Sequence, residues 1–175
     1  MASHEEKKNK VIEVLNKARA LELQAIHQYM NHHYTLDDLD YGELAANVKL
    51  IAIDEMKHAE DLAERIKELG GEPTTEKAGG VETGHEPEEL FAFDAKEEEK
   101  AIDIYQNFLK VCWENGDSIS VKLFESIIEA EQEHFNYFDS INEHIKRLGA
   151  AYLARIAGSP SDTGPSKGFV GQGEA

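Results

Sequence analysis

Apolar residues recur three or four positions apart over four long stretches of the chain, which is the spacing of one face of an α-helix. The first stretch shows the pattern at Val11, Leu15, Ala18, Leu21, Ala25 and Tyr29. We predict long helices over about 5–36, 42–69, 87–115 and 118–148, and a short fifth helix over 150–157. At about 1.5 Å per residue, a helix of about 30 residues is roughly 45 Å long.

The ends of these helices carry recognisable signals. Ser3 and Glu6 have the spacing of a capping box, Gly70 and Gly71 form a left-handed stop, and Pro87 suits a first helical turn. Residues 70–86 have no periodic pattern and read as one long crossover loop. Two hairpins joined by a single long crossover predict an all-α, ferritin-like four-helix bundle.

We assign residues 1–157 to one bundle domain with a short C-terminal helix. From residue 158 onward the chain is rich in Gly, Ser, Pro and Thr. Such a composition is typical of segments without regular structure. We therefore predict a flexible tail over 158–175, and the sequence indicates no function for it.

Two Glu-x-x-His motifs stand out, Glu55 with His58 and Glu131 with His134. Positions i and i+3 share a helix face, so each motif offers an oxygen and a nitrogen ligand to one point. One motif alone is weak evidence, because a chain with 35 acidic residues and 8 histidines produces chance matches.

The spacing strengthens the interpretation. Glu22 lies 33 residues before Glu55, and Glu98 lies 33 residues before Glu131, so the two sets are related by a shift of 76. One Glu from each of two helices and a Glu-x-x-His from each of the other two is the ligand pattern of di-iron carboxylate bundles. Two Fe²⁺ ions would also balance the charge of four buried carboxylates.

We predict that Glu55 and Glu131 bridge the two metals, with two terminal pairs beside them. These pairs are Glu22 with His58 and Glu98 with His134. The shift of 76 also relates Tyr29 to Tyr105. Either tyrosine is a candidate hydrogen-bond donor to a ligand carboxylate, a candidate electron donor to the centre, or an ordinary packing residue. Asp54 is placed to orient a ligand histidine, whereas its counterpart Ala130 is not, so the two metal sites should differ in affinity.

Composition narrows the classes of partner, fold and cellular location that remain. The net charge of −17 disfavours nucleic acid and anionic membranes as partners, and no apolar run is long enough to span a bilayer. The single cysteine, Cys112, excludes a disulfide framework, and the N-terminus has no signal-peptide core. We expect a cytoplasmic protein.

With these motifs in place, the sequence resembles the bacterioferritins from about Val11 to Ala157. The specific stretches are 11–17, 21–29 and 53–59, the last reading Ile-Asp-Glu-Met-Lys-His-Ala. The resemblance implies oxidation of Fe²⁺ by O₂ or H₂O₂ at a ferroxidase centre within each subunit. It also implies a homo-oligomeric shell of 24 subunits, built from twofold dimers, that stores ferric mineral.

The resemblance further implies one haem per two subunits, with a methionine from each as axial ligand. The matching residue is Met56, which helical geometry turns about 100° away from Glu55 and the metals. Leu23, Ile26 and Met30 match positions that line the haem pocket. The porphyrin type is not encoded, and a small ferredoxin- or rubredoxin-type protein is a candidate electron donor to the haem.

Two positions depart from the family. His27 replaces the usual Asn beside the haem region, and Leu50 stands where several members have an iron-binding His, which puts that auxiliary site in doubt. The alternatives are a haem-free bacterial ferritin and a rubrerythrin-like peroxide reductase. The second is disfavoured because one cysteine cannot form a four-thiolate iron site. A helical bundle without metal is the non-enzymatic alternative.

Overall fold

The structure of the chain is a computed structural model that describes residues 3–165 and 168–173. Within these residues it contains five α-helices, one 3₁₀ turn and no β-strand. The elements are α1 His4–Asp38, α2 Gly42–Glu68, α3 Pro87–Glu114, α4 Ser118–Leu148, α5 Ala150–Ile156 and the 3₁₀ turn η1 Val170–Gly173. The predicted all-α bundle with a short fifth helix is therefore confirmed.

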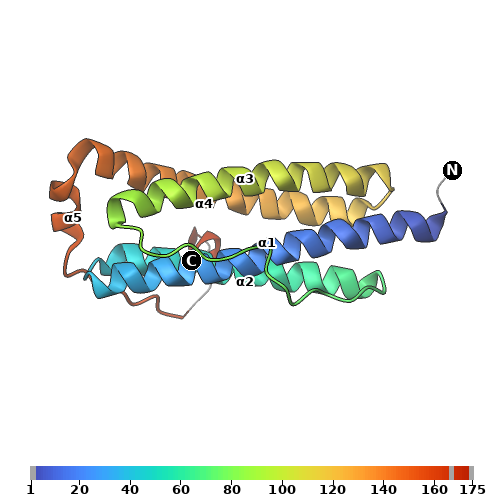
Figure 1. Ribbon diagram of the computed structural model, residues 1–175, viewed down its shortest axis with the longest axis horizontal. Coiled ribbons are helices and arrows are strands. Elements are labelled where there is room, and N and C mark those ends of the chain that lie inside the picture. The colour runs from blue at the N-terminus through green and yellow to red at the C-terminus, as the bar shows by residue number, and fades with distance from the viewer. Residues whose placement is uncertain (1–2, 166–167, 174–175) are drawn as a thin grey trace.

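The four long helices lie alongside one another, and α5 closes one end of the bundle (Figure 1). The hairpins α1–α2 and α3–α4 form the two closest pairs, and α1 also packs on α3 while α2 packs on α4. The bundle thus has an α1/α3 face and an α2/α4 face on opposite sides. None of the described helices is both long enough and apolar enough to cross a membrane.

Local chemistry fixes the helix ends close to their predicted positions. The predicted capping box is present, because the Ser3 amide donates to the Glu6 carboxylate and the Glu6 amide donates to Ser3 Oγ. Gly70, with φ of +78°, ends α2 in the left-handed region that favours glycine. Asp117 caps α4 by accepting hydrogen bonds from the amides of Ile119 and Ser120.

The long crossover from α2 to α3 runs along the outside of α1 (Figure 1). Three amide side chains of α1, at spacings of eight and four residues, hold it through backbone groups. These contacts are Asn16 to residues 72 and 74, Gln24 to Gly80, and Gln28 to both the N–H and C=O of Glu82. These side chains satisfy backbone N–H and C=O groups of the crossover, which forms no helix of its own.

Two apolar clusters fill the bundle on either side of its middle. One gathers around Phe91 and Phe138 near α5, and the other gathers around Leu15, Leu62 and Phe124 toward the opposite end. All five of these side chains are fully buried. The polar centre described below lies between the two clusters, so apolar packing holds its helices from both directions.

The described part of the C-terminal segment follows α2 rather than leaving the molecule. The Gly158 amide donates to the Asp40 carbonyl at 2.8 Å, and Ser159 Oγ accepts from the Glu43 amide at 2.8 Å. Ser159 therefore satisfies one free N–H at the start of α2. The flexibility predicted for 158–175 stays a prediction, and residues 166–167 and 174–175 lie outside the described residues.

Replacement of Asp117 with Ala should destabilise the bundle by about 1–3 kcal/mol. It removes the cap of α4 and the ion pair in which Arg65 Nη2 lies 2.8 Å from Asp117 Oδ1. Calorimetric melting temperatures of the two proteins would measure the loss. An Asp117→Ser variant, which keeps a capping oxygen, should recover part of it.

The effect of Asp117 should also depend on pH. Burial works to raise the pKa of its carboxyl, but hydrogen bonds from Ser120 and Arg65 outweigh burial and lower the pKa below the ordinary value. The unfolded chain therefore takes up the proton first on acidification. The difference in unfolding free energy between the wild type and Asp117→Asn should be full above about pH 4 and shrink below it. A difference that is constant with pH would contradict this.

Candidate metal centre

The six residues predicted as metal ligands lie together at the middle of the bundle. The apolar face of each helix packs against the other helices and holds these residues in place. All are buried, with exposed fractions between 0% and 8%. They are Glu22 on α1, Glu55 and His58 on α2, Glu98 on α3, and Glu131 and His134 on α4. Four helices thus contribute to one pocket, as the repeat in the sequence predicts.

Their ligand atoms form two overlapping groups. The first contains Glu22 and His58, the second contains Glu98 and His134, and both contain Glu55 and Glu131. Within each group the ligand atoms all lie within 4.8 Å of one another. A carboxylate that belongs to two such groups is placed to bridge two ions.

The two carboxylate oxygens of each shared glutamate face different histidines. Glu55 Oε2 lies 2.9 Å from His58 Nδ1, and Glu55 Oε1 lies 3.2 Å from His134 Nδ1. Glu131 Oε1 lies 3.4 Å from His58 Nδ1, and Glu131 Oε2 lies 3.0 Å from His134 Nδ1. Glu22 and Glu98 lie farther out, at 3.7 Å and 3.8 Å from His58 and His134.

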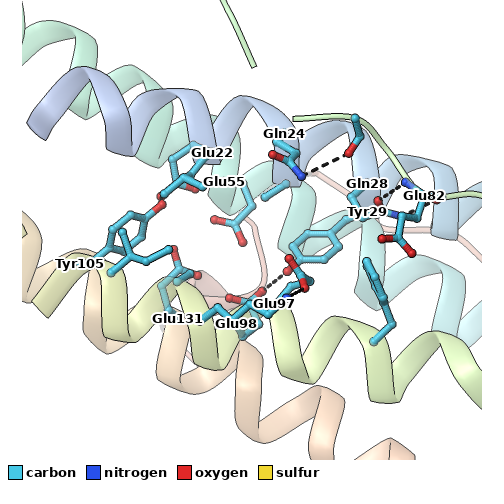
Figure 2. Close-up of a pocket in the computed structure, with 17 residues that line it drawn as sticks. Glu22, Gln24, Gln28, Tyr29, Glu55, Glu82, Glu97, Glu98, Tyr105 and Glu131 are labelled. Carbon is cyan, nitrogen blue, oxygen red and sulfur yellow. Dashed lines mark hydrogen bonds and ion pairs between the residues drawn. The ribbon is translucent and has the colours of Figure 1, made fainter. Parts of the chain in front are cut away.

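The two tyrosines of the repeat hydrogen-bond across the bundle. Tyr29 on α1 donates to Glu98 Oε1 on α3 at 2.5 Å, and Tyr105 on α3 donates to Glu22 Oε1 on α1 at 2.6 Å. Figure 2 shows both rings pointing toward the carboxylates at the two ends of the cluster. Each hydrogen bond orients one outer carboxylate and ties α1 to α3.

Burial makes the outer carboxylates hard to ionise. It is the largest cause that raises the pKa of Glu22 and Glu98 well above the ordinary value, and the charges of Glu131 and Glu55 add to it. Burial and the neighbouring carboxylates also raise the pKa of the Tyr29 hydroxyl, which favours its role as a neutral donor. The outer pair therefore holds protons strongly unless a cation is present.

The inner carboxylates and the histidines behave in the opposite way. Burial works to raise the pKa of Glu55 and Glu131, but the two histidines outweigh it, and the pKa of each lies below the ordinary value. Burial alone would lower the pKa of His58 and His134, yet the surrounding carboxylates raise it well above 6.5. The cluster thus strongly favours positive charge at its centre.

The surroundings of the two histidines differ. Asp54 Oδ2 lies 3.3 Å from His134 Nε2, whereas the equivalent position beside His58 is Ala130. The His134 side chain has an exposed fraction of 0%, against 11% for His58. The outer shell of the cluster is therefore asymmetric although its six inner residues repeat.

A cavity of about 140 Å³ reaches the cluster from the α1/α3 face. Its lining includes Glu22, Glu98 and Glu131 as well as Gly80 and Glu82 of the crossover. Figure 2 shows the crossover held over this cavity by Gln24 and Gln28. Small molecules and ions of about water size thus have a path to the buried carboxylates.

One buried polar pair was not predicted from the sequence. His32 Nδ1 lies 2.9 Å and 3.0 Å from the two carboxylate oxygens of Asp94, and both residues are fully buried. His32 Nε2 lies 3.1 Å from His85 Nδ1 in the crossover. The available signal was that Asp94 lies one turn before Glu98, on the same helix face.

Comparison with known proteins agrees with this architecture. The ferritin-like domain family matches residues 12–148. The chain is 64% identical to the bacterioferritin of Desulfovibrio desulfuricans over 96% of this chain and 94% of that protein. A bacterioferritin from Rhodobacter capsulatus is 33% identical over 87% of this chain and 95% of its own length. The chain belongs to the bacterioferritin family.

Solved bacterioferritin structures superpose closely on the chain. An X-ray structure of the Desulfovibrio desulfuricans bacterioferritin, whose description refers to a di-iron site in different catalytic states, matches with a TM-score of 0.93 and 63% identity. It covers 97% of this chain and 99% of that one. The Mycobacterium tuberculosis bacterioferritin BfrA matches with a TM-score of 0.80 and 32% identity, over 84% of this chain and 93% of that one.

Four residues were assigned to haem by the resemblance to bacterioferritins. They lie away from the carboxylate cluster. Met56 is 53% exposed and lies on the outer side of α2. Leu23, Ile26 and Met30 on α1 are half-buried. Their exposure fits a surface that is covered by another subunit or a ligand, and their haem contacts stay a prediction.

Replacement of Glu98 with Gln should stabilise the metal-free protein while weakening its stabilisation by metal. Because the folded-state pKa of Glu98 is raised, its ionisation costs stability as pH rises, and Gln cannot ionise. We expect the apo-protein to gain about 1–3 kcal/mol, with a larger gain at higher pH. Melting temperatures with and without Zn²⁺, a redox-inert probe, would measure both effects.

Glu99→Gln is the matched control, because Glu99 is the exposed neighbour on the same helix. It should change neither the apo melting temperature nor the rise on adding Zn²⁺. An apo-protein made less stable by Glu98→Gln at every pH would show that the carboxylate contributes to folding rather than opposing it.

Proposed function

We propose that the six clustered residues hold two iron ions and form the ferroxidase centre of an iron-storage protein. Iron storage and ferroxidase activity in general follow from membership of the bacterioferritin family and from the carboxylate–histidine clusters. The observation that carries the residue assignment is the pair of overlapping groups that share Glu55 and Glu131.

The donor set fits iron. Four carboxylates and two imidazoles are hard or borderline ligands that suit Fe and Mn and also admit Zn. Two divalent ions bring four positive charges against four carboxylates, while neutral imidazoles leave the sum unchanged. The cluster offers each ion one histidine nitrogen, one outer carboxylate and a share of two inner carboxylates.

Each residue then has a distinct task. Glu55 and Glu131 would be shared by the two ions, while Glu22 with His58 and Glu98 with His134 would complete the two ends. Iron(II) held there would supply the electrons that reduce O₂ or H₂O₂. Tyr105 and Tyr29 keep Glu22 and Glu98 oriented through their hydrogen bonds, and the cavity on the α1/α3 face admits Fe²⁺ and the oxidant.

Haem and assembly extend the proposal beyond one chain. Family membership supports an oligomeric storage shell. We propose a 24-subunit shell built from twofold dimers, with Met56 of each dimer partner ligating one shared haem. Leu23, Ile26 and Met30 would line its pocket, and a small ferredoxin- or rubredoxin-type protein would supply electrons. The cytoplasmic location stays a prediction.

Anaerobic titration of the apo-protein with Fe²⁺ should show tight uptake of two ions per subunit. Addition of O₂ or H₂O₂ should then rapidly oxidise the bound Fe²⁺, and the rate is measured by absorbance. Glu22→Ala and Glu98→Ala should each lower the initial oxidation rate by roughly tenfold or more, because each removes an end ligand of one ion. Glu99→Ala is the control and should match the wild type.

Uptake of no iron, or oxidation that is unaffected by either ligand substitution, would contradict the proposed centre. That result would support the alternative of a helical bundle without a functional metal site. Uptake of one ion per subunit would contradict the paired arrangement.

The haem assignment has a separate test. Purified protein reconstituted with haem should bind half an equivalent per subunit, measured by its visible absorption. Met56→Leu should abolish the spectrum of a haem with two methionine ligands, whereas Met30→Leu, which keeps both axial ligands, should retain it. One haem per subunit, or none, would instead favour a different ligation or the haem-free ferritin alternative.

A further inference from the structure

The C-terminal segment meets the metal centre from the α2/α4 face. The Val170 amide donates to Asp54 Oδ2 at 2.8 Å, and the same oxygen lies 3.3 Å from His134 Nε2. In Figure 1 the 3₁₀ turn that begins at Val170 lies near the middle of the bundle. The Val170 amide, 116 residues from Asp54 in the sequence, is thus linked through the Asp54 carboxylate to His134, a proposed metal ligand.

Further contacts fix the segment in this position. The Phe169 amide donates to the Leu50 carbonyl at 3.2 Å. The Phe169 ring lies edge-on to His134, with 6.2 Å between ring centroids and 71° between planes, and 5.0 Å from the Tyr137 ring. The segment therefore covers the ring of His134 as well as holding its carboxylate partner.

The close approach of the segment to Asp54 requires a glycine at position 168, just before Phe169. Gly168 is buried and has φ of +88°, a region that favours glycine. A side chain built there would overlap Asp54 Oδ1 and the Lys57 ammonium. The backbone at Gly168 is therefore packed directly against the Asp54 carboxylate.

The other histidine has no such cover among the described residues. His58 borders a pocket of roughly 370 Å³ on the same face, whose lining also includes Asp61, Glu129, Asp54, Val170 and Gly171. The shift that relates the two halves places Ala130 opposite Asp54, so no carboxylate there receives an amide. The segment contacts the His134 ring directly, whereas His58 borders a pocket that Val170 and Gly171 help to line.

We propose that residues 168–171 are a positioning cap that holds the Asp54–His134 pair and makes the metal site at His134 tighter than the site at His58. The Val170 amide fixes the Asp54 carboxylate so that it accepts the Nε2 proton of His134. With the Nε2 proton held by Asp54, Nδ1 is the nitrogen that would give up its proton and offer its lone pair to an ion held among the carboxylates. This role rests on the proposed metal centre and adds to it.

The test removes one backbone donor. Val170→Pro deletes the N–H that bonds to Asp54 at the first position of the 3₁₀ turn, whereas Val170→Ala keeps it. Anaerobic titration of the full assembled protein with Co²⁺, followed by calorimetry and visible absorption, should resolve two binding steps. Val170→Pro should weaken only the tighter step, by about tenfold, and Val170→Ala should match the wild type.

A second measurement does not need the metal. Diethyl pyrocarbonate modifies accessible imidazoles, and peptide mass spectrometry reports each histidine separately. In the apo-protein we expect Val170→Pro to speed modification of His134 several-fold, on the order of the weakening above. Modification of His58 should change less, because Val170 only lines the pocket beside it. If Val170→Pro fails to assemble, a chain that ends at Pro165 replaces it and should give the same two results.

The outcomes separate the cap from the centre. If the wild type binds two Co²⁺ and both variants give identical isotherms and identical His134 modification, the cap is overturned and the proposed function stands. Equal weakening of both steps would also overturn it, because a general loss of packing would then explain the effect. A wild type that binds no Co²⁺ would overturn the metal centre and the cap together.

Discussion

The burial of four carboxylates in one pocket is the constraint on which the rest of this structure depends. Four uncompensated charges at mid-bundle would cost more than a domain of this size can tolerate. The pKa directions show how the chain meets that cost: Glu22 and Glu98 favour their protonated forms, while both histidines favour positive charge. Divalent metal ions can replace these protons, so the feature that opposes folding is also what binds cations.

The remaining fold keeps this pocket closed and aligned. Apolar clusters on either side hold the four helices at a fixed spacing, and Tyr29 and Tyr105 tie α1 to α3 at the level of the site. Two irregular segments cover the two open faces: the crossover lies over α1 and α3, and the C-terminal segment lies over α2 and α4. The two irregular segments therefore cover the sides of the site that the four helices leave open.

The sequence predicted the helices and the convergence of the six side chains because both depend on side-chain patterns. Periodic apolar positions, with capping, proline and glycine signals, placed the helix ends within about three residues, and the shift of 76 grouped the residues that the structure brings together. The contact of Val170 with Asp54 was not predictable in this way. It uses a backbone N–H, which almost every residue possesses, so no residue type marks it. The pairing of His32 with Asp94 was missed because neither residue repeats: the shift of 76 relates His32 to Phe108 and Asp94 to Ala18.

The asymmetry of the centre lies one step outside the six residues that repeat. A change among the six inner residues would remove a ligand or leave a buried charge unpaired, so such a change is costly in either half. Asp54 and Ala130 lie one step farther out, where a difference alters only the support of a ligand. The C-terminal segment exists once per chain and meets only the Asp54 side. In the proposed centre, equal ligand sets with unequal support would allow one ion to be held more firmly than the other without any change in the chemistry of the ligands.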